Sequence, residues 1–253
     1  MIAYFSATGN TGLVARMIAE ATGDTAEYIP DIIASGRKVL ESDRPFVIVT
    51  PIFAWRIPRY VEDFVRDTEF KGDKGAYFVV TCGGEAARAD RYIKRLCEEK
   101  GLDLLGIDVV VMPDNYVVFF EPVDEGTARR MVLDAVPVVD DISDRISGRG
   151  PLEYVTKGGL MKSTLFNSLF IRFYTGGKGF RSTERCTGCG SCVRMCPVDA
   201  ISLEDGRPVW GGPCMQCLAC LNRCSEQAIE FKGRTVGRRR YVCPFDDPSE
   251  LRE

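Results

Sequence analysis

The sequence contains two runs of cysteine with the same internal spacing. Cys186-x2-Cys189-x2-Cys192-x3-Cys196 is followed by Cys214-x2-Cys217-x2-Cys220-x3-Cys224, and these runs hold eight of the eleven cysteines. A cubane iron–sulfur cluster needs four thiolates, of which a tight loop can supply three while the fourth comes from elsewhere in the chain. Two copies of one short unit also indicate internal pseudo-symmetry. The spacing therefore predicts two 4Fe–4S clusters.

The alternative for these cysteines is a pair of structural zinc sites. All-cysteine zinc sites usually combine two CxxC pairs that lie further apart in the sequence. Here three cysteines at CxxCxxC spacing precede a fourth, and in the first run Pro197 follows that fourth cysteine. This pattern favours clusters over zinc. In the second run Ser225 replaces the proline, a change that affects the stiffness of the loop and leaves the ligands intact.

Residues 182–233 resemble bacterial-type ferredoxins that carry two 4Fe–4S clusters. In that pattern the fourth cysteine of each run ligates the cluster of the other run. The resemblance implies two ligand sets, and it leaves no iron open to a substrate. One set is Cys186, Cys189, Cys192 and Cys224, and the other is Cys214, Cys217, Cys220 and Cys196.

A second candidate site follows the first apolar run of the chain. The segment Ser6-Ala7-Thr8-Gly9-Asn10-Thr11 precedes an amphipathic stretch that predicts a helix. Hydroxyl groups and free backbone N–H groups at the start of a helix can bind an anion, and the segment has no cationic side chain. The alternative is an ordinary capped helix start. The pattern resembles the flavodoxin phosphate loop, which implies an FMN phosphate bound by N–H and O–H dipoles.

Two further loops are predicted to lie beside this one. Residues 50–55 follow the predicted strand Pro45–Thr50, and residues 81–84 follow Ala76–Thr81, so both come after strand carboxyl ends, where ligands bind in doubly wound sheets. In flavodoxin-like proteins these loops flank the isoalloxazine ring. The resemblance implies an FMN site made of Ser6, Thr8, Gly9, Asn10, Thr11, Pro51, Ile52, Phe53, Ala54, Trp55, Thr81, Cys82, Gly83 and Gly84.

The order of apolar segments predicts the fold and the domains. Short apolar runs at 2–5, 26–29, 45–50, 76–81 and 105–112 alternate with amphipathic segments at 11–21, 58–67, 85–100 and 127–146, which indicates a parallel sheet with helices on both faces. We predict an α/β, flavodoxin-like, doubly wound five-stranded parallel sheet, followed by a small α+β two-cluster ferredoxin-like domain. The boundaries are 1–148 for the FMN domain, 149–181 for a basic linker with a helix at 160–174, 182–234 for the cluster domain and 235–253 for a tail.

The composition of the chain excludes several kinds of site and partner. The chain of 253 residues has no histidine, which removes the usual neutral-pH base, mixed cysteine–histidine zinc sites and Rieske clusters. Residues 1–148 hold 17 basic and 25 acidic side chains, a net charge of −8, which argues against nucleic acid as a partner. No apolar run is long enough to span a bilayer and no signal peptide is evident, so we predict a cytoplasmic protein. The cysteine-rich cluster favours metal binding in that reducing compartment.

The combined pattern resembles flavodoxin–ferredoxin fusions of anaerobic bacteria and archaea, which Met112-Pro113-Asp114-Asn115-Tyr116 also resembles. The resemblance implies an oxidoreductase or electron-transport protein that passes single electrons between two 4Fe–4S clusters and FMN. One alternative is a flavin-dependent reductase of a small molecule bound near Trp55, Tyr116 and Phe119–Phe120. A redox-sensing or docking module is another, with the linker helix or the Arg238–Arg240 run as its contact surface. The sequence leaves open the redox partner, a homodimer, and the roles of Cys82, Cys97 and Cys243.

Overall fold

The computed structural model describes residues 1–153 and 159–251. Its first part is a five-stranded parallel sheet in the order β2-β1-β4-β6-β7, which confirms the predicted flavodoxin-like doubly wound sheet. The strands of this sheet are β1 (Ile2–Tyr4), β2 (Ala26–Tyr28), β4 (Phe46–Pro51), β6 (Gly75–Cys82) and β7 (Asp103–Val111). A separate parallel pair, which the sequence analysis missed, joins β3 (Val39–Ser42) to β5 (Glu69–Gly72).

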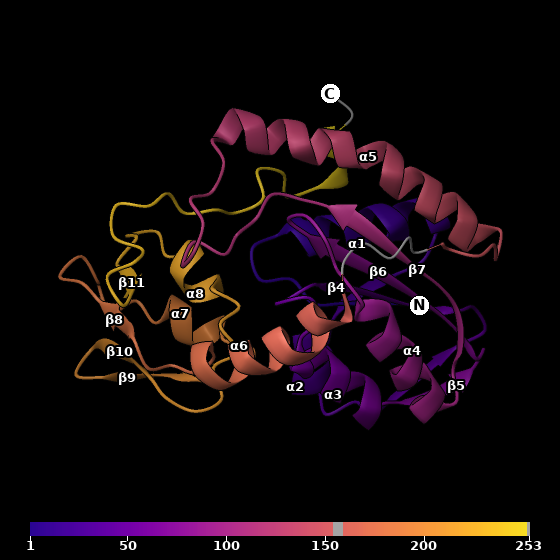
Figure 1. Cartoon of the computed structure of the whole chain (residues 1–253), viewed down its shortest axis with the longest axis horizontal. Helices are drawn as coiled ribbons and strands as arrows, with labels where there is room; N and C mark the ends of the chain where they lie inside the picture. The colour runs from indigo at the N-terminus through magenta and orange to yellow at the C-terminus, as the bar shows by residue number, and fades with distance from the viewer. Residues whose placement is uncertain (154–158, 252–253) are drawn as a thin grey trace.

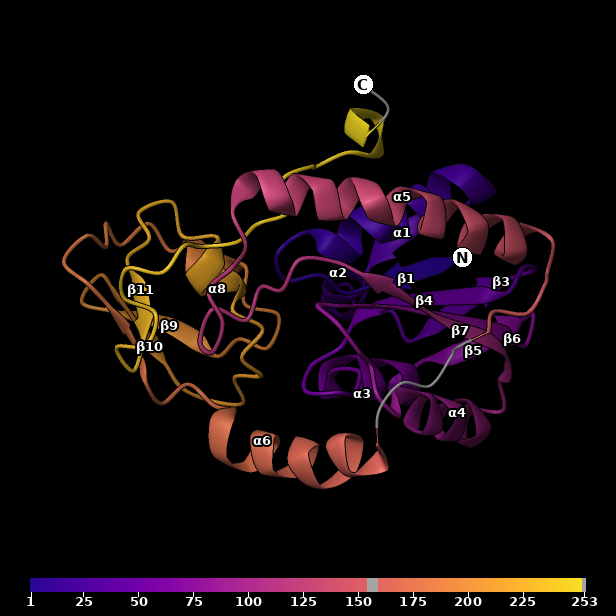
Figure 2. The same ribbon diagram turned by 45° about the horizontal axis from the view of Figure 1, so that its top comes forward.

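Helices cover both faces of the main sheet (Figure 2). Alternate strand residues face opposite cores, so Val47 and Val49 pack with one helix layer while Phe46 and Ile48 pack with the other. The first layer contains α1 (Asn10–Thr22) and α5 (Glu125–Ser147), and the second contains α2 (Ile29–Ala34), α3 (Arg59–Asp67) and α4 (Ala89–Lys100). The sequence predicted each of these helices except α2.

The cysteine-rich part forms a second, smaller body beside the carboxyl ends of the strands (Figure 1). Each cysteine run begins as an extended loop and ends in one helical turn. The elements are β8 (Phe180–Ser182), α7 (Ser191–Arg194), β9 (Ile201–Glu204), β10 (Arg207–Trp210), α8 (Ala219–Asn222) and β11 (Ile229–Phe231). Antiparallel pairs β9–β10 and β8–β11 complete the predicted small α+β unit.

The linker forms a helix that spans the two bodies (Figure 2). A π-helical turn, η1 (Lys162–Phe166), leads into α6 (Asn167–Tyr174). Asn167 donates a hydrogen bond to the Ala54 carbonyl at 2.8 Å, and Lys162 pairs with Glu85. The helix therefore packs on the first domain as a connection, while its outer face leaves Met161, Leu165, Phe166, Leu169 and Phe173 exposed.

The tail returns from the cluster domain to the flavodoxin domain and ends in η2 (Pro248–Leu251). The sequence left the Arg238–Arg240 run as a possible contact surface, and in the structure the side chain of Arg240 is 6% exposed and forms an ion pair of 2.9 Å with the buried Glu230. Phe245 is buried in the core formed by α1 and α5. The tail is thus packed against both domains.

Candidate flavin and cluster sites

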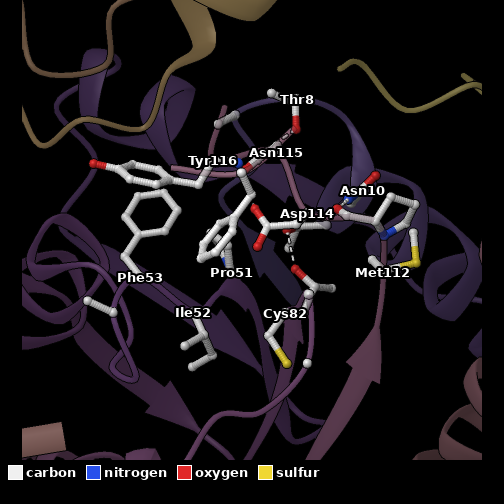
Figure 3. A pocket seen from close by; sticks show the side chains of 18 of the residues that line it. Thr8, Asn10, Pro51, Ile52, Phe53, Cys82, Met112, Asp114, Asn115 and Tyr116 are labelled. Carbon is white, nitrogen blue, oxygen red and sulfur yellow. Dashed lines mark hydrogen bonds between the residues drawn. The ribbon is translucent and has the colours of Figure 1, made fainter. Parts of the chain in front are cut away.

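A cavity of about 420 Å³ opens at the carboxyl ends of β4 and β6 (Figure 3). All the residues predicted to bind FMN line it, with the exception of Gly9. The cavity also includes residues outside the predicted FMN set. These are Ala7, Glu85, Met112, Pro113, Asp114, Asn115, Tyr116, Phe119, Phe120, Phe170, Met215 and Gln216.

The phosphate loop has the features of an anion site. No side chain caps the first turn of α1, and within the described residues no backbone carbonyl accepts from the N–H groups of Asn10, Thr11 or Gly12. These groups lie at the positive end of the helix dipole, where an anion is stabilised. The loop is held in shape by a hydrogen bond of 2.8 Å between the Thr11 and Thr81 hydroxyls. The donors present therefore fit a flavin phosphate.

Gly9 supports the loop from outside the cavity. Its φ of +111° is a conformation that side chains rarely adopt, and a Cβ there would lie 2.6 Å from the Cβ of Cys243. Cys243 is buried, and its backbone N–H donates to the Thr8 carbonyl at 2.7 Å. Cys243, which the sequence left without a role, thus packs directly beneath the phosphate loop.

Aromatic and apolar side chains form the part of the cavity predicted for the ring. Phe53 and Tyr116 are among the labelled side chains that line the cavity in Figure 3, as are Ile52 and Cys82. Trp55 also lines the cavity, at a left-handed φ of +64°. Such planar and apolar surfaces suit an isoalloxazine ring, which binds through stacking. The lining of the cavity thus suits both the phosphate end and the ring end of a flavin.

Cys82 lies in the cavity as a protonated thiol. Desolvation raises its pKa, and the carboxylates of Asp114 and Glu85 add to the rise. A neutral thiol is a weak nucleophile. Cys97 lies on the buried face of α4, and desolvation raises its pKa to about 12. Both cysteines are therefore unsuited to redox chemistry of their own.

The four cysteines predicted for one cluster lie close together in the structure. The pKa of Cys217 is raised to about 12, mainly by desolvation and in part by the nearby Cys214 and Cys196 thiols. Desolvation also raises the pKa of Cys220, with contributions from Cys217, Cys214 and Cys196. Cys196 thus lies beside the second cysteine run, the arrangement that crossed ligation requires.

Three cysteines of the first run also lie near one another. Desolvation raises the pKa of Cys192, and Cys186 and Cys189 contribute as near neighbours. Within the described residues, no three cysteine, aspartate or glutamate side chains converge as a single metal ion requires.

The two repeats also share their backbone conformation. The N–H groups of Ala200 and Ala228 donate to the Cys196 and Cys224 sulfurs at 3.3 and 3.4 Å. N–H donors to a thiolate stabilise its charge, so these contacts fit cluster-bound sulfurs. The predicted pseudo-symmetry is therefore visible in the hydrogen bonds.

The second cysteine run lies next to the flavin cavity. Met215 and Gln216, between Cys214 and Cys217, line it, and the Tyr116 hydroxyl donates to Gln216 Oε1 at 2.7 Å. Met215 and Cys217 also pack against the core under α3. The sequence analysis missed this contact, because the spacing within each run does not indicate which run faces the first domain.

Comparison with protein families matches residues 1–107 to the flavodoxin domain and residues 181–202 to the 4Fe-4S binding domain. Among curated proteins, Ferredoxin-3 of Desulfocurvibacter africanus and Ferredoxin-1 of Nitratidesulfovibrio vulgaris are each 52% identical over 27 residues. The match covers 11% of this chain and 44% of each ferredoxin, so the chain spans less than half the length of these relatives.

Two solved structures are similar at low identity. The Trp repressor binding protein from Bacillus subtilis is 14% identical, with a TM-score of 0.35, over 55% of this chain and 96% of that one. The azoreductase from Bacillus anthracis is 10% identical, with a TM-score of 0.35, over 57% and 98%.

The chain thus joins a flavodoxin domain to a 4Fe–4S ferredoxin domain, as the sequence predicted. No helix in residues 1–153 or 159–251 is long and apolar enough to cross a membrane.

Proposed function

We propose that the protein carries single electrons between two 4Fe–4S clusters and FMN. Residues 1–148 would bind FMN, residues 149–181 would link the two domains, residues 182–234 would hold the clusters and residues 235–253 would form the tail. The observation that carries the proposal is the position of Met215 and Gln216, which belong to the second cysteine run and line the flavin cavity. One cluster would therefore lie beside the flavin, as electron transfer between them requires.

The proposal assigns an order to the three cofactors. We call the set Cys196, Cys214, Cys217 and Cys220 the proximal set, because its loop lines the cavity. The set Cys186, Cys189, Cys192 and Cys224 is the distal set, and its Cys189 is exposed. Electrons would enter or leave through the distal cluster and reach the flavin through the proximal one. The FMN supplies a centre that takes two electrons and exchanges them singly.

The chain's own residues would hold the flavin. Thr8, Asn10 and Thr11 with the first turn of α1 would bind the phosphate, and Phe53, Trp55 and Tyr116 would enclose the ring. The residues 81–84 would supply backbone groups along the ring edge. Asp114 lies in the cavity and accepts from the Tyr116 N–H at 2.6 Å, so its carboxylate would disfavour negative charge on the flavin.

The test is an anaerobic stepwise reduction of the cofactor-loaded protein. We expect about eight iron atoms and one FMN per chain, and an uptake of about four electrons, since each cluster takes one and a flavin takes two. A protein without flavin would contradict the assignment of the cavity. A protein with about four iron atoms would contradict the assignment of two clusters.

A second candidate function is a flavin-dependent reductase of a small molecule. The observation that favours it is an aromatic group at the cavity, where Tyr116 lies 5.5 Å from Phe119 and 5.8 Å from Phe170 between ring centroids, and Phe120 is 60% exposed. Oxidation of the reduced protein separates the two functions. A carrier would react fast with one-electron protein acceptors, whereas a reductase would show saturation with a small molecule that takes two electrons at once.

A further inference from the structure

The phosphate loop is held by a chain of hydrogen bonds that passes through the ferredoxin domain. On one side, Asn115 Nδ2 donates to Thr8 Oγ1 at 2.8 Å, and Asn222 Nδ2 donates to the Asn115 carbonyl at 3.2 Å. On the other, the Tyr241 hydroxyl donates to Asn10 Oδ1 at 2.6 Å, and its N–H donates to Asn222 Oδ1 at 3.1 Å. Asn222 therefore joins two residues of the loop through two separate partners.

These groups are shielded from water, so their hydrogen bonds fix the loop strongly. Thr8, Asn10, Asn222 and Tyr241 are each at most 8% exposed. Desolvation raises the pKa of Tyr241, so its hydroxyl keeps its proton at neutral pH and acts as the donor to Asn10. A buried polar group that loses its partner destabilises the arrangement more than an exposed one does.

Asn10 has both ends of its side chain occupied. Its Oδ1 accepts from Tyr241, and its Nδ2 donates to the Pro113 carbonyl at 2.9 Å. Figure 3 shows Thr8 and Asn115 in contact at one edge of the cavity and Asn10 beside residues 112–114. The amide of Asn10 is thus locked, and so is the first turn of α1 that it begins.

A second contact comes from the same helix of the ferredoxin domain. Arg223, directly after α8, donates from Nε to the Ala7 carbonyl at 2.8 Å. It places a guanidinium beside a loop that has no cationic side chain of its own. Asn222 and Arg223 lie between Cys220 of the proximal set and Cys224 of the distal set. The residues that hold the loop are therefore adjacent to residues proposed to hold both clusters.

We propose that Asn222 and Tyr241 are positioning residues for the flavin phosphate, so that the ferredoxin domain and tail complete the phosphate site of the flavodoxin domain. This inference rests on the proposed function, because it takes FMN and the clusters as bound. It predicts that the contacts favour a phosphorylated flavin over riboflavin, since both branches of the chain of hydrogen bonds end on Thr8 and Asn10 of the loop that would meet the phosphate.

The experiment compares the affinity of the Tyr241→Phe variant for FMN with its affinity for riboflavin. The flavin is removed from the cluster-loaded full chain, and each flavin is titrated back anaerobically while its fluorescence is followed. We expect Tyr241→Phe to weaken the affinity for FMN about fivefold to tenfold, which is the effect of losing one buried hydrogen bond. The affinity for riboflavin should change by less than about twofold. Iron content is measured in each sample to show that the clusters remain.

The matched control is Tyr92→Phe, which removes a hydroxyl from a tyrosine whose ring lies 3.7 Å under the Arg56 guanidinium, outside the cavity lining. It should leave both affinities unchanged. Asn222→Ala is the second variant, and it should show the same contrast between FMN and riboflavin. This variant keeps the inference testable if Tyr241→Phe does not retain its clusters.

The outcomes separate this inference from the proposed function. If the unaltered protein binds no FMN, the proposed function fails. If it binds FMN and both variants bind FMN equally well, the positioning role alone is wrong. An equal loss of FMN and riboflavin affinity would also overturn it, because that result indicates a general loss of stability.

Discussion

The two cysteine repeats share a backbone conformation but differ in their side chains. The two runs are offset by 28 positions, so Gly188 and Gly190 correspond to Gln216 and Leu218. All four have a left-handed φ, at +69° and +74° in the first repeat and +55° and +60° in the second. Glycine adopts this conformation freely, whereas glutamine and leucine adopt it at a cost of about 1 kcal/mol or more.

The strained residues of the second repeat make the contacts that the first repeat lacks. Gln216 bonds to Tyr116 at the flavin cavity, and Leu218 is 1% exposed. In the first repeat the corresponding loop faces outward, and Cys189 is exposed where Cys217 is half-buried. The two repeats thus share a backbone conformation, and the second repeat forms the interface with the first domain at a cost in local backbone strain.

The largest effect should come from the cysteines that cross between repeats. In the double variant Cys196→Ala with Cys214→Ala, both removed ligands belong to the proximal set, so the distal cluster should remain and iron should fall to about four atoms per chain. In Cys186→Ala with Cys196→Ala, one ligand is lost from each set and iron should fall towards zero. The measurement is iron and sulfide content of anaerobically purified protein. The reverse order of iron contents would show that each run holds its own cluster and would remove the crossed arrangement.

The next effect concerns Phe231 and Leu203, which occupy the same position in the two repeats. Phe231 is 2% exposed and its ring lies 4.8 Å from that of Phe180, whereas Leu203 is 42% exposed. Phe231→Ala should destabilise the protein by about 3–5 kcal/mol, because it leaves a cavity in the core. Leu203→Ala should change the stability by less than about 0.5 kcal/mol. The stability of each variant is measured as the denaturant concentration at which cluster absorbance is lost. Similar stability losses in the two variants would mean that the two repeats are equally packed.

The smallest effect concerns Gly188 and Gln216, each replaced by alanine. A Cβ at Gly188 would lie 2.7 Å from the Gly206 carbonyl oxygen, so Gly188→Ala should cost about 1–3 kcal/mol. Gln216→Ala removes the hydrogen bond with Tyr116 and adds no steric conflict, so it should cost about 1 kcal/mol. The same denaturation assay compares them, with FMN affinity as a second readout. Only Gln216→Ala should alter FMN binding, and a change in Gly188→Ala as well would contradict the division between an outward and an inward repeat.

The sequence predicted the features that depend on local patterns. Strand and helix periodicity gave the five-stranded sheet and four of its helices, and cysteine spacing gave the repeat. It missed α2, β3 and β5, since these segments are short and their apolar residues show little periodicity: α2 has six residues and the two strands have four each.

The parts of the site that the sequence could not predict depend on contacts between distant segments. Met215, Phe170 and Cys243 have no distinctive spacing, and their positions follow from the packing of the second domain and tail on the first. The burial of the Arg240 side chain likewise depends on its ion pair with Glu230 of β11. Such pairings are tertiary and leave no local signal in one sequence.

The contact between Asn10 and Tyr241 joins residues 231 positions apart. During synthesis the phosphate loop emerges before the cysteine-rich part, and Tyr241 follows only after that part. Contacts of such separation form late, because most of the intervening chain must be ordered before they close. Capture of the flavin would therefore follow maturation of the iron–sulfur part, so that a nascent or half-assembled chain holds its flavin weakly.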